Sequence, residues 1–280
     1  MLRLYKVEQH SFKGTMLRQT STMHALHDLM LLSFLLCLGT KADGSEIVNG
    51  TEVPDGKMLY MVSVQNATDH ICGGFLYNEE FVITAAHCDS EKARVSHVVL
   101  GSNNLNNINK TMRIKIKKCK HEDYTKTASG HDIMLLQLTK KVKLSNKVEQ
   151  IKLPKSGTNV SANTKCTVAG WGNTETRGKV MKKLRMVEVS VIDLNQCKRV
   201  WKKSNGNFPN NIVCAGGYKV NQGFCQGDSG GPLVCDETAV GIVSFNYKHD
   251  CDYPNRPNVY TDVSKYIDWI KKTVKQKKCK

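Results

Sequence analysis

The stretch Gly227-Asp228-Ser229-Gly230-Gly231-Pro232 is the most informative part of this sequence. Its glycines predict a tight turn that exposes the hydroxyl of Ser229. A hydroxyl is a weak nucleophile, so it needs a base at hydrogen-bond distance before it can attack a carbonyl carbon. In such an attack the backbone N–H groups of Gly227 and Ser229 are expected to converge on the developing oxyanion. A glycine-rich turn is by itself usually only a structural turn. The catalytic interpretation therefore requires a base elsewhere in the chain.

Two further motifs provide a base and a partner for it. His87 lies near the end of Thr84-Ala85-Ala86-His87-Cys88, and Asp132 opens the apolar run Asp132-Ile133-Met134-Leu135-Leu136. Each alone is more typical of a structural residue, whereas the order His, Asp, Ser in one chain indicates acyl transfer. In that chemistry His87 takes the proton of Ser229 and later gives it to the leaving amine, while Asp132 fixes the imidazole tautomer.

The body of the chain has the pattern of an all-β protein. Short β-branched runs recur between Gly, Asn and Pro residues, at 61–64, 81–84, 98–100, 112–116, 133–138, 167–169, 184–190 and 239–244. Such a series predicts strands that close as barrels or stack as sandwiches. Helical spacing of apolar residues predicts one helix over 263–276, and Asp193 is a candidate N-cap for a second, short helix. A boundary near 151–157 would divide the chain into two similar halves.

Composition narrows the class of protein further. The 280 residues carry a formal charge of +16 and eleven cysteines. The charge of +16 excludes an acidic disordered chain, and an apolar fraction of 40% suffices for a sizeable core. The sequence has no C-x-x-C pair, which argues against zinc knuckles and thioredoxin-like sites and favours disulfides formed in an oxidising compartment.

The N-terminal segment 1–44 is predicted to be a signal for secretion and not part of the fold. Residues 29–38 form an apolar run of signal-peptide length, too short for a stable transmembrane helix, and small residues predict cleavage after Gly44. Met16 and Met23 are alternative starts of the chain. A type II membrane anchor is the competing interpretation of this segment.

Removal of that segment changes two of the counts. It takes away Cys37, so ten of the eleven cysteines remain. Five of the 41 basic and four of the 25 acidic residues lie before Ile47, so residues 47–280 keep a charge of +15. The basic character therefore belongs to the mature protein.

The sequence resembles the chymotrypsin family of serine proteases, and the likeness covers all of residues 47–280. The motifs that carry it are Ile47-Val48-Asn49-Gly50, those around His87, Asp132 and Ser229, and Gly170-Trp171-Gly172. The Met-Leu-Leu-Gln that follows Asp132-Ile133 resembles the granzyme and mast-cell-protease branch. The resemblance implies two antiparallel six-stranded β-barrels with the three catalytic residues at their junction. Its implied bounds are about 47–150 for the first barrel, 151–262 for the second and 263–276 for a C-terminal helix.

The resemblance also implies how the enzyme is activated. A freed ammonium group of Ile47 would pair with Asp228 and order the oxyanion hole, because a buried carboxylate without a partner is costly. Ser45-Glu46 resembles the dipeptide that granule proteases lose to a dipeptidyl peptidase. Because Glu46 is neither Lys nor Arg, a trypsin-like activator is not expected.

The cysteines pair, by the same resemblance, into four disulfides: Cys72–Cys88, Cys166–Cys235, Cys197–Cys214 and Cys225–Cys251. Sequence alone could not choose these pairings. Cys119 and Cys279 are left over, and they either pair within the chain or link two chains.

The expected substrate-binding residues are Gly223, Phe224, Ser244, Phe245, Asn246 and Asn258, with Ser244 also supporting Asp132. Gly223 stands where trypsin-like relatives carry an aspartate, so cleavage after Lys or Arg loses its counter-charge. Asn246 replaces a glycine at the pocket mouth, and Asn258 is expected at the back wall. These differences predict a narrow, amide-lined pocket for small or medium uncharged side chains. Alternatively, Asn246 turns aside and a chymotrypsin-like preference survives.

Partners follow from charge and compartment. Protein or peptide substrates, serpin inhibitors and sulfated proteoglycan are expected, with basic clusters at 110–120, 140–147, 179–185, 198–203 and 271–280. Nucleic-acid binding is not expected, because the chain is predicted to be secreted and contains no known nucleic-acid-recognition motif. The mature protein is expected to be a monomer that does not bind membranes, secreted and stored in granules. Candidate glycosylation sites are Asn49, Asn66, Asn109 and Asn159.

No cofactor or metal is expected, because the loop 101–110 lacks acidic residues for calcium. Two competing functions remain. One is a catalytically restricted or inactive, heparin-binding defence protein on the same scaffold. The other is a digestive enzyme, which Glu46 and Gly223 disfavour.

Overall fold

The computed structural model describes residues 47–202, 208–253 and 255–280. The predicted signal segment with Cys37, its cleavage site and the dipeptide Ser45-Glu46 lie outside the described residues. Within the described part of the chain, no helix has the length and apolar character needed to cross a bilayer.

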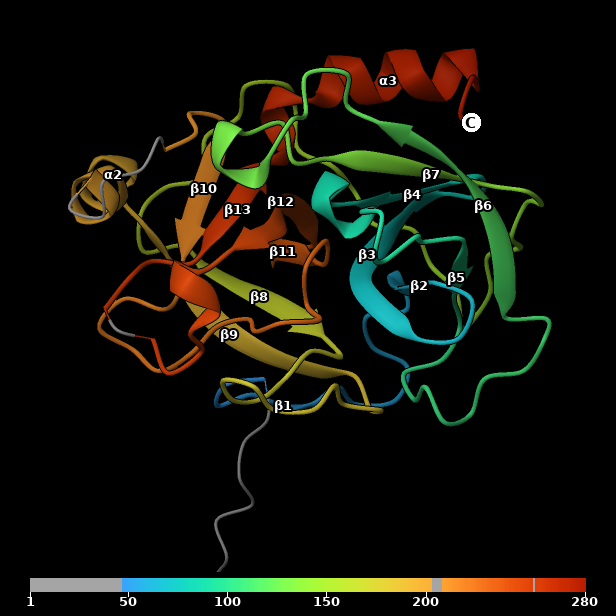
Figure 1. Cartoon of the computed structure of the whole chain (residues 1–280), viewed down its shortest axis with the longest axis horizontal. Coiled ribbons are helices and arrows are strands. Elements are labelled where there is room, and N and C mark those ends of the chain that lie inside the picture. Colours follow the sequence, from blue (N-terminus) through green and yellow to red (C-terminus); the bar gives the residue numbers. More distant parts are fainter. Residues whose placement is uncertain (1–46, 203–207, 254) are drawn as a thin grey trace, which may run out of the picture. The chain divides into compact units, whose positions relative to one another are not determined.

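The first barrel is formed by six antiparallel strands, closed in the order β2-β3-β4-β7-β6-β5 (Figure 1). They are β2 (Met61–Gln65), β3 (His70–Asn78), β4 (Phe81–Thr84), β5 (His97–Val99), β6 (Arg113–Lys120) and β7 (Met134–Leu138). Apolar side chains such as Phe75, Ile83 and Leu135 fill its interior with no exposed surface. Their burial supplies most of the driving force for closing the barrel.

The second barrel repeats this architecture with β8 (Lys165–Gly170), β9 (Arg185–Ile192), β10 (Ile212–Ala215), β11 (Pro232–Cys235), β12 (Thr238–Phe245) and β13 (Val259–Asp262). Pairing of β8 with β9 closes it, and the short β1 (Thr51–Glu52) extends the sheet along β9. The expectation of an all-β fold with two antiparallel six-stranded barrels is confirmed.

Two α-helices complete the described fold. Asp193 accepts a 2.8 Å hydrogen bond from the Gln196 amide and so caps α2 (Leu194–Lys202), as expected. The terminal helix α3 (Ile267–Gln276) begins later than expected, because residues 263–265 form the 3₁₀ turn η4. There the Asp262 side chain accepts from the Ser264 amide and tightens the backbone.

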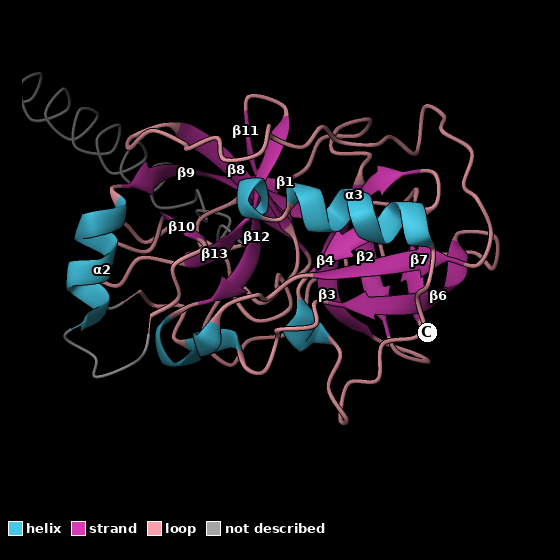
Figure 2. Ribbon diagram, turned by 90° about the horizontal axis from the view of Figure 1, so that it is seen from above, coloured by secondary structure: helices cyan, strands magenta, loops and turns pink. Residues whose placement is uncertain are grey.

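The chain end returns to the first barrel. Ile267 and Ile270 of α3 are buried in the same apolar cluster as Phe75 and Leu135, and Figure 2 shows the helix lying along this barrel. Beyond α3, the Lys280 amide and carbonyl pair with those of Lys118 on β6.

The described residues form five disulfides: Cys72–Cys88, Cys119–Cys279, Cys166–Cys235, Cys197–Cys214 and Cys225–Cys251. Four of them join the cysteines that the family resemblance pairs. The fifth lies within the chain and ties β6 to the C-terminus, beside the Lys118–Lys280 backbone pair.

Candidate active site

His87 is positioned by the 3₁₀ turn η1 (Ala86–Cys88), which directly follows β4. The turn is anchored twice to Asp132, at the start of the run into β7. The backbone N–H of His87 donates to Asp132 Oδ1 at 2.9 Å, and the ring Nδ1–H donates to Asp132 Oδ2 at 2.7 Å. The second bond fixes the tautomer, so Nε2 of the neutral ring is left with the free lone pair of a base.

Asp132 is fully buried and is held by the second barrel. The Ser244 hydroxyl of β12 donates to Asp132 Oδ2 at 2.6 Å, and the Thr261 hydroxyl of β13 donates to the Asp132 carbonyl at 3.0 Å. Burial raises the pKa of Asp132. The charge of His87 and the hydrogen bonds from His87 and Ser244 lower this pKa by more than burial raises it, so the net pKa lies below its ordinary value. The carboxylate is therefore ionised at neutral pH.

The same pair raises the basicity of His87. Burial lowers the pKa of His87, yet the carboxylate of Asp132 opposes this more strongly, and the net pKa lies above 6.5.

Ser229 and His87 line one pocket of about 310 Å³. Ser229 enters from the glycine-rich turn before β11, so the two barrels each contribute one of these groups. Thr127 and Ala128, in the loop between β6 and β7, form another wall of the pocket. The three residues predicted from sequence thus come together at the junction of the barrels.

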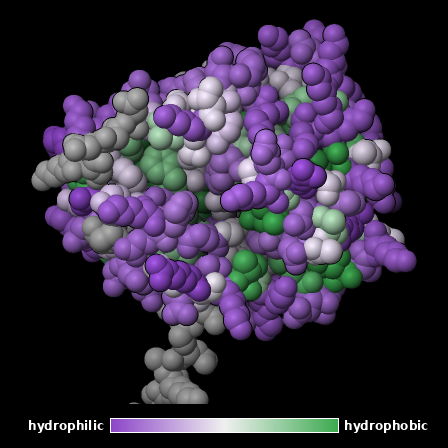
Figure 3. All heavy atoms as spheres, in the orientation of Figure 1, coloured by the Kyte–Doolittle hydropathy of each residue, from purple (hydrophilic) through white to green (hydrophobic). Residues whose placement is uncertain are grey.

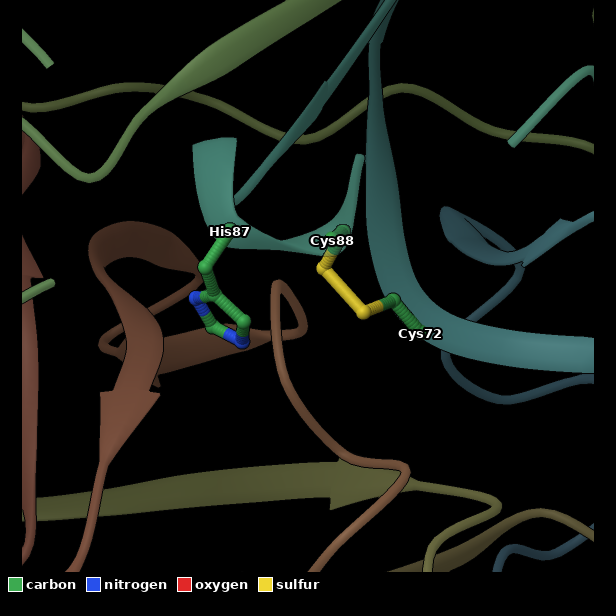
Figure 4. A group of neighbouring side chains, drawn as sticks. All are labelled: Cys72, His87 and Cys88. Carbon is green, nitrogen blue, oxygen red and sulfur yellow. A yellow bond between two sulfur atoms is a disulfide. The ribbon is translucent and has the colours of Figure 1, made fainter. Parts of the chain in front are cut away.

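Metal chemistry through the cysteines beside His87 is excluded by their bonding. Figure 4 shows Cys72 and Cys88 joined in a disulfide beside the His87 ring, one nitrogen of which lies within 4.8 Å of both sulfur atoms. A disulfide sulfur is not a thiolate ligand. His87 is therefore available as a base.

Gly227 has the backbone that an oxyanion site requires. Its φ is +99°, and a Cβ there would lie 2.8 Å from the Cα of Gly172, so only glycine fits without strain. The carbonyl of Gly227 accepts from His70 Nε2 at 2.9 Å, and the Ser63 hydroxyl pairs with the other ring nitrogen of His70 at 2.8 Å. The N–H of Gly227 lies in the same peptide plane as the Gln226 carbonyl, which accepts from the Asn173 amide at 2.7 Å, so this N–H also has a fixed direction.

His70 and Ser63 were missed in the sequence. Burial lowers the pKa of His70 to about 4, so its ring is neutral and donates through Nε2. No local motif distinguishes these residues from other strand residues. Only the closing of β3 against the Ser229 turn gives them a role, and the Gly73 amide, which donates to the Ser229 carbonyl at 2.8 Å, belongs to the same contact.

Asp228 lies directly behind Ser229 and has no exposed surface. Its two oxygens accept from the amides of Gly172 at 2.7 Å and Cys225 at 2.9 Å. Burial nevertheless raises its pKa to about 7, since two amides replace only part of the lost hydration. Ile47 is equally buried, in the apolar cluster of the second barrel.

The expected substrate-binding residues fall into two groups. Phe224, Ser244, Phe245 and Asn246 line the pocket with Ser229. Asn246 turns its amide to the loop behind it, where it donates to the Asp250 carbonyl at 3.2 Å. Its side chain is therefore held to one side and does not hang free over the mouth.

Gly223 and Asn258 are outside this lining and pack against each other. A Cβ on Gly223, whose φ is +156°, would fall 2.2 Å from Asn258 Nδ2 and 2.8 Å from the Tyr253 hydroxyl. Tyr253 is held by its own hydrogen bond to the Phe224 carbonyl at 2.6 Å. No local pattern singles out Tyr253, because its place depends on the fold of the 247–258 loop.

Comparison with known proteins agrees with this geometry. A family model described as Trypsin matches residues 47–270. The chain is 38% identical over 252 residues to granzyme B(G,H) of Mus musculus, covering 88% of this chain and 98% of that protein. Granzyme M of Homo sapiens is 36% identical over 82% of this chain and 89% of its own length.

Among solved structures, a mutant of human heparin binding protein (CAP37) superimposes with a TM-score of 0.72 and 33% identity, covering 82% of this chain and 97% of that one. Fold, site and relatives together define the class: the chain belongs to the trypsin family of serine proteases.

Proposed function

We propose that this chain is a secreted, granule-type serine endopeptidase that hydrolyses peptide bonds through an acyl-enzyme. The observation that carries the proposal is the 2.7 Å bond between His87 Nδ1 and Asp132 Oδ2, with Ser229 in the same pocket as His87. Granzyme and mast cell protease relatives support granule storage and secretion.

The mechanism follows from this arrangement. His87 Nε2 takes the proton of Ser229 as its oxygen attacks the peptide carbonyl, and the imidazolium is stabilised by Asp132. The N–H groups of Gly227 and Ser229 receive the oxyanion of the tetrahedral intermediate. His87 then protonates the leaving amine, and water repeats the sequence to release the acid and restore Ser229.

Activation by removal of Ser45-Glu46 is part of the proposal. It is supported by the burial of Ile47 and by the elevated pKa of Asp228, a carboxyl without a cationic partner among the described residues. A free ammonium of Ile47 would supply that partner and keep Asp228 ionised. A dipeptidyl peptidase is the expected activator.

Specificity is proposed to favour small or medium uncharged side chains before the scissile bond. Because Asn246 is held to one side of the pocket mouth, this narrowing rests on Asn258 and Tyr253 beside Gly223, and cleavage mainly after large apolar residues would contradict it. The pocket lining includes no acidic residue among the described residues, and Asn258 and Tyr253 occupy the space beside Gly223. A cationic side chain would therefore be desolvated without a counter-charge.

The test uses chain that begins at Ile47. We expect covalent labelling of Ser229 by a fluorophosphonate, loss of labelling in Ser229→Ala, and cleavage of a peptide library after uncharged residues. A chain that begins at Ile47, is folded, and neither labels nor cleaves any library member would refute the peptidase function. Full activity of chain that begins elsewhere would refute the activation step alone.

A second candidate is a catalytically restricted or inactive heparin-binding protein. It is favoured by the likeness to human heparin binding protein and by the excess of lysine. Figure 3 shows mostly hydrophilic side chains on the face it presents. Elution from heparin well above physiological salt, without labelling of Ser229, would favour this function; strong retention with labelling would support proteoglycan storage of an active enzyme.

A further inference from the structure

Two histidines and an aspartate meet where the chain leaves β6 and enters β7. Lys120 at the end of β6 pairs with Met134 at the start of β7, so the segment between them begins and ends at neighbouring points. One ring nitrogen each of His121 and His131 and one carboxylate oxygen of Asp123 all lie within 4.8 Å of one another. This set was not foreseen from the sequence, where the two histidines are ten positions apart.

Aromatic rings hold the two imidazoles in place. The ring of His121 stacks on that of His131, with centroids 4.8 Å apart, and lies 4.9 Å from the Trp269 ring of α3. Tyr266 meets His121 edge-on at 5.4 Å. His121 is 8% exposed, whereas Asp123 faces solvent. The donors therefore have an apolar floor and an open side, as a metal site with a water ligand requires.

We propose that His121, Asp123 and His131 bind a divalent transition-metal ion of the Zn²⁺ type, and that the bound ion lowers peptidase activity. Two imidazoles and one carboxylate are the ligand types that Zn²⁺ prefers, and three protein ligands leave a position for water. Bonds of about 2.0–2.2 Å in a tetrahedron place ligand atoms roughly 3.5 Å apart, so the set closes by about 1 Å.

Closure requires the two stacked imidazoles to tilt, because a metal ion lies in the plane of each ring that binds it. It also replaces long contacts, one of them between the Tyr266 hydroxyl and His131 Nδ1 at 3.5 Å. The Asp123 amide donates to His121 Nδ1 at 3.2 Å, a long hydrogen bond that a metal at this nitrogen would replace. Glu122 is not counted among the ligands, because its carboxylate accepts a hydrogen bond from the Trp269 indole at 2.8 Å. Asp123 lies in an exposed turn and is free to move toward the histidines.

The ion would act on catalysis through two direct connections, and this part rests on the proposed peptidase function. His131 immediately precedes Asp132 in the sequence. Asp123 and His131 also flank the loop whose Thr127 and Ala128 form a wall of the substrate pocket. Joining the ends of this loop therefore displaces the wall, and pulling on His131 displaces the carboxylate that orients His87.

The experiment measures binding and activity separately on the chain that begins at Ile47. Zn²⁺ binding is followed by calorimetry, and Co²⁺ binding by its visible absorption. The variants are Asp123→Asn and His131→Asn, since asparagine tolerates the φ of +55° at residue 131. His97→Asn, a partly exposed histidine on β5, is the matched control.

We expect one Zn²⁺ per chain in the unaltered protein and in His97→Asn, and affinity at least about 100-fold weaker in the two site variants. Zn²⁺ should lower kcat/KM in the unaltered protein and in His97→Asn, but not in Asp123→Asn or His131→Asn. Unchanged binding in His131→Asn would overturn the site. Loss of binding with inhibition retained would overturn the regulatory effect. A chain without activity even in chelator would refute the peptidase function, while the binding measurements would still decide the site.

Discussion

The hydroxyl of Ser244 and the ring Nδ1–H of His87 donate to the same carboxylate oxygen of Asp132, at 2.6 Å and 2.7 Å. These donors come from different barrels, so the position of the base depends on how the barrels meet. A hydrogen bond to a charged group is worth about 1.5–3 kcal/mol when its donor is removed.

Ser244→Ala should therefore lower kcat by about tenfold or more while the protein stays folded. The measurement is kcat and KM on the best peptide from the library. Ser264→Ala, which removes another buried hydroxyl bonded to an aspartate but far from His87, is the matched control. Equal kcat in the two variants would show that Ser244 does not position the base.

The pH dependence of activity should follow His87. Because the pKa of His87 lies above 6.5, the protonated and inactive ring persists to higher pH than in free histidine. We expect kcat/KM to rise with pH and to reach half of its plateau above pH 6.5. The profile is to be recorded with an uncharged peptide and with chelator present. A midpoint below 6.5 would contradict this account of the Asp132 charge.

Before cleavage, Asp228 should make the folded precursor less stable as pH rises. Its pKa is about 7 in the folded chain, against an ordinary value of 3.8, so the folded state binds more protons between these values. Folding stability is therefore lost from about pH 4 to pH 7, by up to about 4 kcal/mol. His70 has the opposite effect on folding stability. Its pKa falls from 6.5 to about 4 on folding, so its contribution to stability increases as pH rises through this range.

The contribution of Asp228 is isolated by comparing the precursor with its Asp228→Asn variant in chemical denaturation at pH 4.5 and 8. The variant should lack this loss, and release of the Ile47 ammonium should reverse it in the mature chain. The same pH dependence in both precursors would contradict the prediction.

Placing an acidic residue at 223 should not create trypsin-like specificity. In Gly223→Asp the new Cβ meets Asn258 Nδ2 at 2.2 Å, and the backbone strain at φ +156° costs about 1–3 kcal/mol. We expect a less stable protein without cleavage after Arg. Adding Asn258→Gly should recover part of the stability and allow Arg cleavage, measured as kcat/KM for Arg and Leu peptides. Efficient Arg cleavage by the single variant would show that Asn258 does not block a side chain at position 223.

The disulfide Cys119–Cys279 should stabilise the fold more than Cys197–Cys214. The first closes a sequence separation of 160 and the second one of 17, and a longer loop restricts the unfolded chain more. Replacing both cysteines of the first pair by serine should lower the free energy of unfolding by about 4–5 kcal/mol, against about 3 for the second pair. Denaturant unfolding of both variants measures this, and an equal loss would contradict it.

The all-β class was predicted from local patterns, whereas the two six-stranded barrels were implied by the family resemblance. His87, Asp132 and Ser229 were singled out as candidates because each lies in a short local motif. The alternating residues of β6 predict a strand, and the short glycine-rich motif around Ser229 predicts a tight turn. The two-residue β1 was not foreseen, nor were β3, β10, β11 and β13, since their runs are interrupted, as by Gly73 and Gly74, or lack alternation.

The rest of the site depends on contacts between distant segments. His70 meets Gly227 across 157 positions of sequence, and no pattern near either residue reveals it. The packing of Tyr253 and Asn258 against Gly223 likewise follows from the path of one loop. Similarly, Asn246 was a clear departure from the family pattern, but only its bond to the Asp250 carbonyl decides where its amide points.

The link between Cys119 and Cys279 also bears on how this protein ages. A peptide bond cut anywhere between these two residues leaves both fragments covalently attached, while Lys280 stays paired with Lys118. A single self-inflicted cut within more than half of the chain would thus pass unseen on a non-reducing gel and release no fragment into solution. The two fragments of such a nicked molecule separate only after the Cys119–Cys279 disulfide has been reduced.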